Sequence, residues 1–229
     1  MVRDNVQKIL SEIEASCRKA GREAREVTLV GVTKTVGADV IQEAIGAGIK
    51  HIAENRVQEA ENKFPSLLAK NPHIKTHIIG HLQTNKARDV IKVCSLLQSV
   101  DSLKLAFEIE KQAAKSGRVV DILVQFNTAH EEQKFGADPV QAQVLIEGIS
   151  QLEHVRIKGL MCMAPYTEDQ GIIRKTFSDL RGIRESIKTR FAGHPRVDMG
   201  ILSMGMSGDY QIAIEEGSTM VRIGSAIFK

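Results

Sequence analysis

The sequence predicts an α/β protein built as a single (β/α)8 TIM barrel over residues 1–229, with one extra helix at the N-terminus. Eight short runs rich in Val, Ile, Leu and Met recur along the 229 residues. Nearly continuous apolar runs of this kind are typical of strands buried on both faces of a parallel sheet. Amphipathic segments separate the runs, and regular alternation of strand and helix is the pattern of a parallel barrel.

The apolar runs define the expected strands. In chain order they are Val27–Val32, Lys50–Ala53, His77–Gly80, Leu96–Val100, Asp121–Phe126, Ile157–Cys162, Val197–Leu202 and Met220–Gly224. An open doubly wound sheet is the alternative, but it usually has fewer strands and a glycine-rich first turn. The first turn here reads Thr-Lys-Thr-Val-Gly over residues 33–37 and lacks that fingerprint. The barrel is therefore the favoured architecture.

The segments between the runs have the spacing and the end signals of helices. Four of the expected helices are Val40–Ala47, Val57–Lys70, Thr167–Arg190 and Ser207–Gly217. Another is expected between Ser102, a plausible cap, and Gly117, a stop signal. A further helix is expected to begin at Asp138 and Pro139, with proline in its first turn. No strand precedes Asp4–Ala20, so this segment is expected to be an additional helix covering the barrel wall.

The composition excludes several classes of protein. Hydrophobic residues make up 42% and charged residues 26%, with a formal net charge of +3, so nucleic-acid binding is not expected. No apolar run is long enough to span a membrane, and the charged N-terminus is not a secretory signal. Cys17, Cys94 and Cys162 are odd in number and widely spaced, which argues against a disulfide framework or a metal site and favours the cytoplasm.

Function in a parallel barrel collects at the carboxyl ends of the strands, and the first strand is followed there by Lys34. Burial near the barrel mouth would lower the pKa of a lysine and make its amine able to form a Schiff base. A lysine that extends to the rim and stays solvated is the alternative. Polar clusters also follow the second and third strands, and they contain Asn55 and His81. Asn55 could instead cap a helix, and His81 could be a structural histidine.

Glycine- and serine-rich turns follow the last two strands. One turn runs from Ser203 to Asp209 and the other is Gly224–Ser225. Small residues let backbone N–H groups approach an anion, and the last two units of a barrel often bind phosphate. Ser207 could instead only cap the final helix.

Arg222 lies inside the last strand among apolar neighbours and therefore needs an acceptor. It could point into the barrel mouth and meet a ring nitrogen, or it could form a salt bridge with Glu215 or Glu216. A lysine, a phosphate cradle and this arginine together suit a cofactor that carries an aldehyde, a phosphate and a pyridine nitrogen.

The sequence also resembles a known family. The strings VTLVGVTKT, AENRVQEA, HIIGHLQTNK, SVDS, KFG, GLMCMAP, LSMGMSGDY and EGSTMVRIGSAIF occur in order over nearly the whole chain. They are similar to those of the pyridoxal phosphate homeostasis proteins, also called the proline synthase co-transcribed family. The resemblance implies a fold-type III barrel, like the N-terminal domain of alanine racemase, that binds pyridoxal 5′-phosphate (PLP).

The resemblance further implies which residues meet the cofactor. Lys34 would form the Schiff base, Arg222 would lie near the pyridine nitrogen, and Ser203 with the backbone of Gly224 and Ser225 would hold the phosphate. Asn55 and His81 match positions that line the cofactor side of the barrel. Lys134 matches a loop lysine that could also meet the cofactor.

We expect a non-catalytic PLP carrier that controls the intracellular level of the cofactor and could pass it to apo-enzymes that need PLP. Arginine cannot readily give a proton to the ring nitrogen, which makes the ring a poorer electron sink. The racemases take their tyrosine base from a second domain, for which this chain is expected to have no room. Tyr166, after the sixth strand, could act as a base.

Two other functions stay open. One is a small PLP-dependent amino-acid racemase or decarboxylase, and the other is a barrel enzyme acting on a phosphorylated sugar without a cofactor. The family resemblance implies a monomer.

Overall fold

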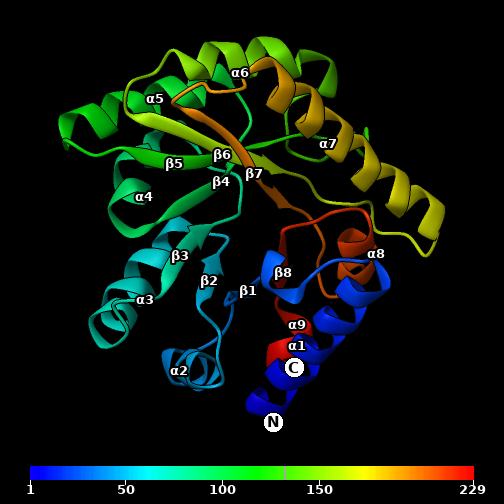
Figure 1. Cartoon of the computed structure of the whole chain (residues 1–229). Helices are drawn as coiled ribbons and strands as arrows, with labels where there is room; N and C mark the ends of the chain where they lie inside the picture. Colours follow the sequence, from blue (N-terminus) through cyan, green and yellow to red (C-terminus); the bar gives the residue numbers. More distant parts are fainter. Residues whose placement is uncertain (132) are drawn as a thin grey trace.

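The computed structural model describes residues 1–131 and 133–229 and contains a closed barrel of parallel strands in the order β1 to β8 (Figure 1). The strands are β1 Thr28–Val32, β2 His51–Glu54, β3 Lys75–Ile78, β4 Leu96–Val100, β5 Val120–Gln125, β6 Val155–Met161, β7 Val197–Ser203 and β8 Met220–Ile223. The predicted barrel is confirmed, and the open-sheet alternative is wrong because β1 pairs with β8. The third strand begins two residues earlier than predicted, at Lys75.

Helices surround the barrel (Figure 1). They are α1 Val2–Lys19, α2 Ala38–Gly46, α3 Val57–Lys70, α4 Ala87–Val93, α5 Leu103–Lys115, α6 Ala142–Ser150, α7 Gln170–Arg190, α8 Tyr210–Glu215 and α9 Ser225–Phe228. Short 3-10 turns occupy Ala24–Glu26, Thr84–Lys86 and Pro139–Gln141. Helix α1 lies against α2, α8 and α9, which confirms that the extra helix covers the wall.

The predicted end signals explain several helix boundaries. The hydroxyl of Ser102 accepts a hydrogen bond from the backbone N–H of Leu105 at the start of α5. Asp138 caps the 3-10 turn that leads into α6. The sequence prediction missed α4 and α9, which have only seven and four residues and are too short for a clear helical period.

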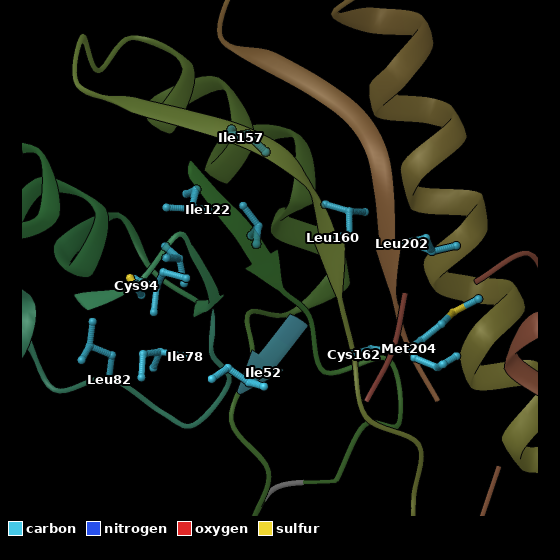
Figure 2. Close-up of a cluster of buried hydrophobic side chains, with 14 of the residues drawn as sticks. Ile52, Ile78, Leu82, Cys94, Ile122, Ile157, Leu160, Cys162, Leu202 and Met204 are labelled. Atoms are coloured by element: carbon cyan, nitrogen blue, oxygen red, sulfur yellow. The ribbon is translucent and has the colours of Figure 1, made fainter. Parts of the chain in front are cut away.

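Apolar side chains form two separate layers, one outside and one inside the strands. The outer layer fills the space between strands and helices and includes Ile52, Ile122, Leu160 and Leu202, and Figure 2 shows part of it on neighbouring strands. The inner cluster fills the barrel lumen and consists of Val30, Ala53, Leu96, Leu123, Met161 and Met220. The barrel is therefore a packed core, and a ligand has access at its ends.

Two further observations bear on the sequence analysis. In the described part of the chain, none of the helices combines the length and apolarity that crossing a bilayer requires. Cys17, Cys94 and Cys162 are all buried free thiols. Burial raises the pKa of each, to about 12 for Cys94 and Cys162.

Candidate functional site

The carboxyl ends of β1 and β8 bring two of the predicted features together. Val30 pairs with Arg222 and Gly31 with Ile223, so the next residues, Val32 and Gly224, lie level at the barrel mouth. A Cβ atom on Gly224 would approach the Val32 carbonyl oxygen to 3.2 Å. Lys34 follows two residues after Val32, at the same rim as the Gly224–Ser225 turn.

Lys34 is exposed at this rim, which corrects the expectation of a buried amine. The strand ends at Val32, and the chain turns away at Thr35, a non-glycine residue with φ of +64°. A side chain on such a turn extends toward solvent instead of into the packed lumen. Lys34 therefore occupies the predicted end of the barrel, with its side chain exposed to solvent.

The two turns expected to hold a phosphate lie against each other. The backbone N–H of Arg222 donates to the carbonyl of Gly205 at 2.9 Å. The hydroxyl of Ser207 accepts from the backbone N–H of Ala226 at 3.4 Å. Ser207 therefore does not cap helix α8, whose N-terminal flanking residue is Asp209. The structure assembles the turn after β7 and the start of α9 into one surface at the barrel mouth.

Glycine at position 205 has a packing role that the sequence did not reveal. Its φ is +98°, and a Cβ atom there would lie 2.6 Å from the Cβ of Ala213 and 2.9 Å from the Cα of Tyr210. Real Cβ atoms do not approach neighbours so closely, so only glycine lets helix α8 pack against this turn.

Arg222 is 3% exposed and points into the lumen. In residues 1–131 and 133–229, the hydrogen-bond partners of its guanidinium are the hydroxyl of Ser203, at 2.7 Å, and the carbonyl of Cys162, at 2.8 Å. Burial lowers the pKa of Arg222, and electrostatic interactions with Cys162 and Asp209 partly oppose this effect. A buried cation with neutral hydrogen-bond partners creates a positive potential in the lumen below the mouth.

The alternative salt bridges for Arg222 are wrong. Glu215 pairs with Lys19 and Arg174, and Glu216 pairs with Arg174 and Arg181. These contacts join helices on the outer surface of the barrel, whereas Arg222 faces the lumen.

Ser203 is fully buried at the end of β7 and is the first of several linked polar groups. Its hydroxyl accepts from Arg222 and donates to the Gln98 side-chain oxygen, at 2.7 Å in each case. Sequence reasoning missed Gln98 because a single glutamine in an apolar strand is not a distinctive signal.

Asn55 is exposed directly after β2, and its backbone lies against Gly80, where a Cβ atom would come within 2.0 Å of the Asn55 carbonyl oxygen. The preceding residue, Glu54, is fully buried. Its Oε1 accepts from the hydroxyl of Thr33 at 2.7 Å and from Lys63 at 3.0 Å. Lys63 also donates to the Thr33 carbonyl at 3.2 Å. This Glu54–Lys63 pair, which the sequence analysis missed, joins the end of β2 to the segment that carries Lys34.

His81 faces a different part of the rim. Its ring stacks on Phe135, with centroids 3.9 Å apart and planes 9° apart, and its Nδ1 lies 3.4 Å from Asp101. With Asp101 and Lys104, His81 lines an open pocket of about 530 Å³. In the described residues its ring has no contact with Lys34 or Arg222, so its role toward a cofactor stays a prediction.

The remaining loop candidates also have defined positions. Lys134 donates to the carbonyl of Ala164 at 2.9 Å and pairs with Glu131. The side chain of Tyr166 is fully exposed. Tyr210 is buried and donates to Glu12 of α1; burial and that carboxylate raise its pKa. Of the two tyrosines in the chain, only Tyr166 therefore lies on a loop at the mouth.

The residues at the mouth fit a cofactor that has an anionic group, a ring nitrogen and an amine-reactive group. Arg222 supplies a buried donor that has no anionic hydrogen-bond partner among the described residues. The turns after β7 and β8 supply backbone N–H groups and hydroxyls, and Lys34 supplies an amine. This donor set matches the chemistry of PLP.

Comparison with known proteins identifies the family. The model of the alanine racemase N-terminal domain matches residues 9–229. The pyridoxal phosphate homeostasis protein of Aquifex aeolicus is 38% identical over 225 residues, covering 98% of this chain and 96% of the relative. That of Helicobacter pylori is 34% identical over 229 residues, covering 99% and 98%.

Solved structures agree with this relationship. PipY of Synechococcus elongatus with PLP bound has a TM-score of 0.86 and 31% identity, and the match covers 100% of both chains. Alanine racemase of Clostridium difficile has a TM-score of 0.76 at 16% identity, and the match covers 98% of this chain and 59% of the racemase, so it shows the shared fold alone. The chain described here belongs to the alanine racemase N-terminal domain family and, within it, to the pyridoxal phosphate homeostasis proteins.

Proposed function

We propose that this chain binds pyridoxal 5′-phosphate reversibly at the barrel mouth, holds it as a Schiff base on Lys34, and controls its free level in the cytoplasm. The observation that carries the proposal is Arg222, a buried cation whose hydrogen-bond partners in the described chain are neutral. Burying such a charge is costly unless a ligand completes its interactions. The two joined turns beside it offer a place for the phosphate.

The residues have distinct roles in this proposal. Bound PLP supplies an aldehyde that reacts with amines. Lys34 provides the amine, Arg222 donates toward the pyridine nitrogen, and Ser203, Gly224 and Ser225 surround the phosphate. Asn55 and His81 line the mouth around them. Backbone N–H groups and hydroxyls bind phosphate well because they donate without a net charge of their own.

Several features favour holding the cofactor over catalysis. Arg222 can only donate, so it does not readily protonate the ring nitrogen. Tyr210 is bonded to Glu12 away from the lumen, and Tyr166 is fully exposed and lacks the packing that would orient a base. The exposed position of Lys34 suits exchange of the cofactor. We expect the protein to act as a monomer and to pass PLP to apo-enzymes.

The test is a spectroscopic titration of the purified protein with PLP. We expect an absorbance band at about 420 nm, lost in Lys34→Ala and retained in Lys70→Ala, a control at an exposed lysine at the end of α3. Borohydride reduction followed by peptide mapping should label Lys34. Label on another lysine, or an unchanged band in Lys34→Ala, refutes the assignment. Turnover of amino acids above the rate with free PLP, lost in Lys34→Ala, contradicts the non-catalytic role.

A further inference from the structure

Five polar side chains form a continuous line of hydrogen bonds across the barrel lumen. Arg222 of β8 bonds to Ser203 of β7 at 2.7 Å, and Ser203 bonds to Gln98 of β4 at 2.7 Å. Gln98 bonds in turn to His77 of β3 at 2.8 Å, and His77 bonds to His51 of β2 at 2.9 Å. All but His51 are fully or nearly fully buried. We call these five residues the lumen chain.

Strand alternation places every member of the lumen chain inside the barrel. Side chains two residues apart on a strand share a face. Ala53, Leu96 and Met220 belong to the inner cluster, and Ile79 and Ile201 pack against it. Each of these residues lies two positions from one member of the chain. Aliphatic residues and methionines form the inner cluster around the lumen chain, so polar side chains are not needed merely to fill this volume.

Arg222 and the orientation of the Gln98 amide together fix the direction of every hydrogen bond in the chain. A guanidinium has no acceptor, so the Ser203 oxygen must accept from it. The Ser203 hydroxyl proton then points to the side-chain oxygen of Gln98, and the Gln98 amide nitrogen donates to Nδ1 of His77. His77 must therefore carry its proton on Nε2 and donate it to Nδ1 of His51. Both histidines are then neutral, with the proton on Nε2.

The electrostatics of the lumen agree with neutral histidines. Burial, with a smaller effect of His51, lowers the pKa of His77 to about 3. Burial lowers the pKa of His51 as well, with the charges of Lys75 and Lys50 acting in the same direction. Neither ring gains a proton near neutral pH, so the direction set by Arg222 is not disturbed.

We infer that Gln98 and His77 are positioning residues that hold Ser203 and Arg222 in the orientation needed to receive the cofactor, an inference that rests on the proposed function. Ser203 contacts both Gln98 and Arg222, so the rotamer of its hydroxyl is set from both sides. The guanidinium plane is in turn fixed by Ser203 on one nitrogen and by the carbonyl of Cys162 on the other. Without Gln98, the Ser203 hydroxyl is free to rotate, and the hydrogen bond that it accepts from the guanidinium is less well oriented.

The first test needs no variant and no cofactor. Nitrogen-15 NMR of histidine-labelled apo-protein distinguishes the two neutral tautomers and the charged ring. At about pH 7 we expect both His77 and His51 to be neutral with the proton on Nε2. A proton on Nδ1 of His77, or a charged His77 ring, overturns the direction of the chain whether or not the protein binds PLP.

The second test uses two replacements of Gln98. Gln98→Met keeps a similar volume but removes both polar atoms, and Gln98→Glu keeps the shape but cannot donate to His77. We expect PLP to bind about tenfold more weakly to each variant, with a shifted absorbance band, and we expect Nδ1 of His77 to gain a proton in Gln98→Glu. Leu123→Met, a lumen change outside the chain, should leave affinity and band unchanged.

The outcomes of the two tests are separable. Unaltered affinity and band position in both Gln98 variants overturn the positioning role while leaving PLP binding intact. Failure of the unmodified protein to bind PLP refutes the proposed function itself, and the tautomer measurement still reports on the lumen chain.

Discussion

The buried pair of Glu54 and Lys63 offers a sharp test of how the mouth is held together. Glu54 is fully buried and Lys63 has 14% of its side chain exposed, with 3.0 Å between the charged atoms. The second carboxylate oxygen of Glu54 has no hydrogen-bond partner among the described residues. Lys63→Met would therefore leave a buried carboxylate supported only by the hydroxyl of Thr33.

Removing one partner of a buried ion pair costs about 3–5 kcal/mol, and the partial exposure of Lys63 places the expected loss near the lower limit, about 3 kcal/mol. Burial alone would lower the pKa of Lys63, but hydrogen bonds to Glu54 and Glu59 outweigh it and the pKa is raised. A lysine with a raised pKa stabilises the fold fully at neutral pH, and this contribution disappears only as the pH rises through the folded-state pKa. The whole loss should therefore be visible at about pH 7.

The assay is urea unfolding of Lys63→Met and the unmodified protein at about pH 7. Lys8→Met is the matched control, because the Lys8–Glu12 pair is 4.0 Å long with Lys8 74% exposed, and its loss should cost less than about 0.5 kcal/mol. A difference below about 1 kcal/mol for Lys63→Met would refute the reasoning.

Two other predictions follow from the backbone and the thiols. Gly159 has φ of +151°, and a Cβ atom there would lie 1.8 Å from the Ile201 carbonyl oxygen, so Gly159→Ala should cost about 4 kcal/mol or prevent folding. Gly117→Ala, with φ of +61° and no neighbour within 4 Å, should cost only about 1–2 kcal/mol when both variants are compared by urea unfolding. Burial raises the pKa of Cys94 and Cys162 to about 12, so a thiol reagent at about pH 8 should label them only after denaturation. Rapid labelling of the folded protein would contradict their burial.

The sequence by itself determined the architecture and the end of the barrel where the site lies. Apolar runs such as Leu96–Val100 are local signals of buried parallel strands, and the alternation with helices allows few topologies. Because parallel strands in a barrel place all their carboxyl ends at one mouth, the sequence alone assigns Lys34 and the turn at Gly224 to the same region.

Only the tertiary structure decided how those residues are supported. Ser203 and Gln98 are 105 positions apart, and their contact depends on the closure of the barrel, which brings β7 and β4 across one lumen. The Glu54–Lys63 pair depends on how α3 packs against β2, and the exposure of Lys34 depends on the turn at Thr35. Hydrophobic periodicity is a property of neighbouring residues, whereas the pairing of buried polar groups is set by distant parts of the chain that meet only in the folded barrel.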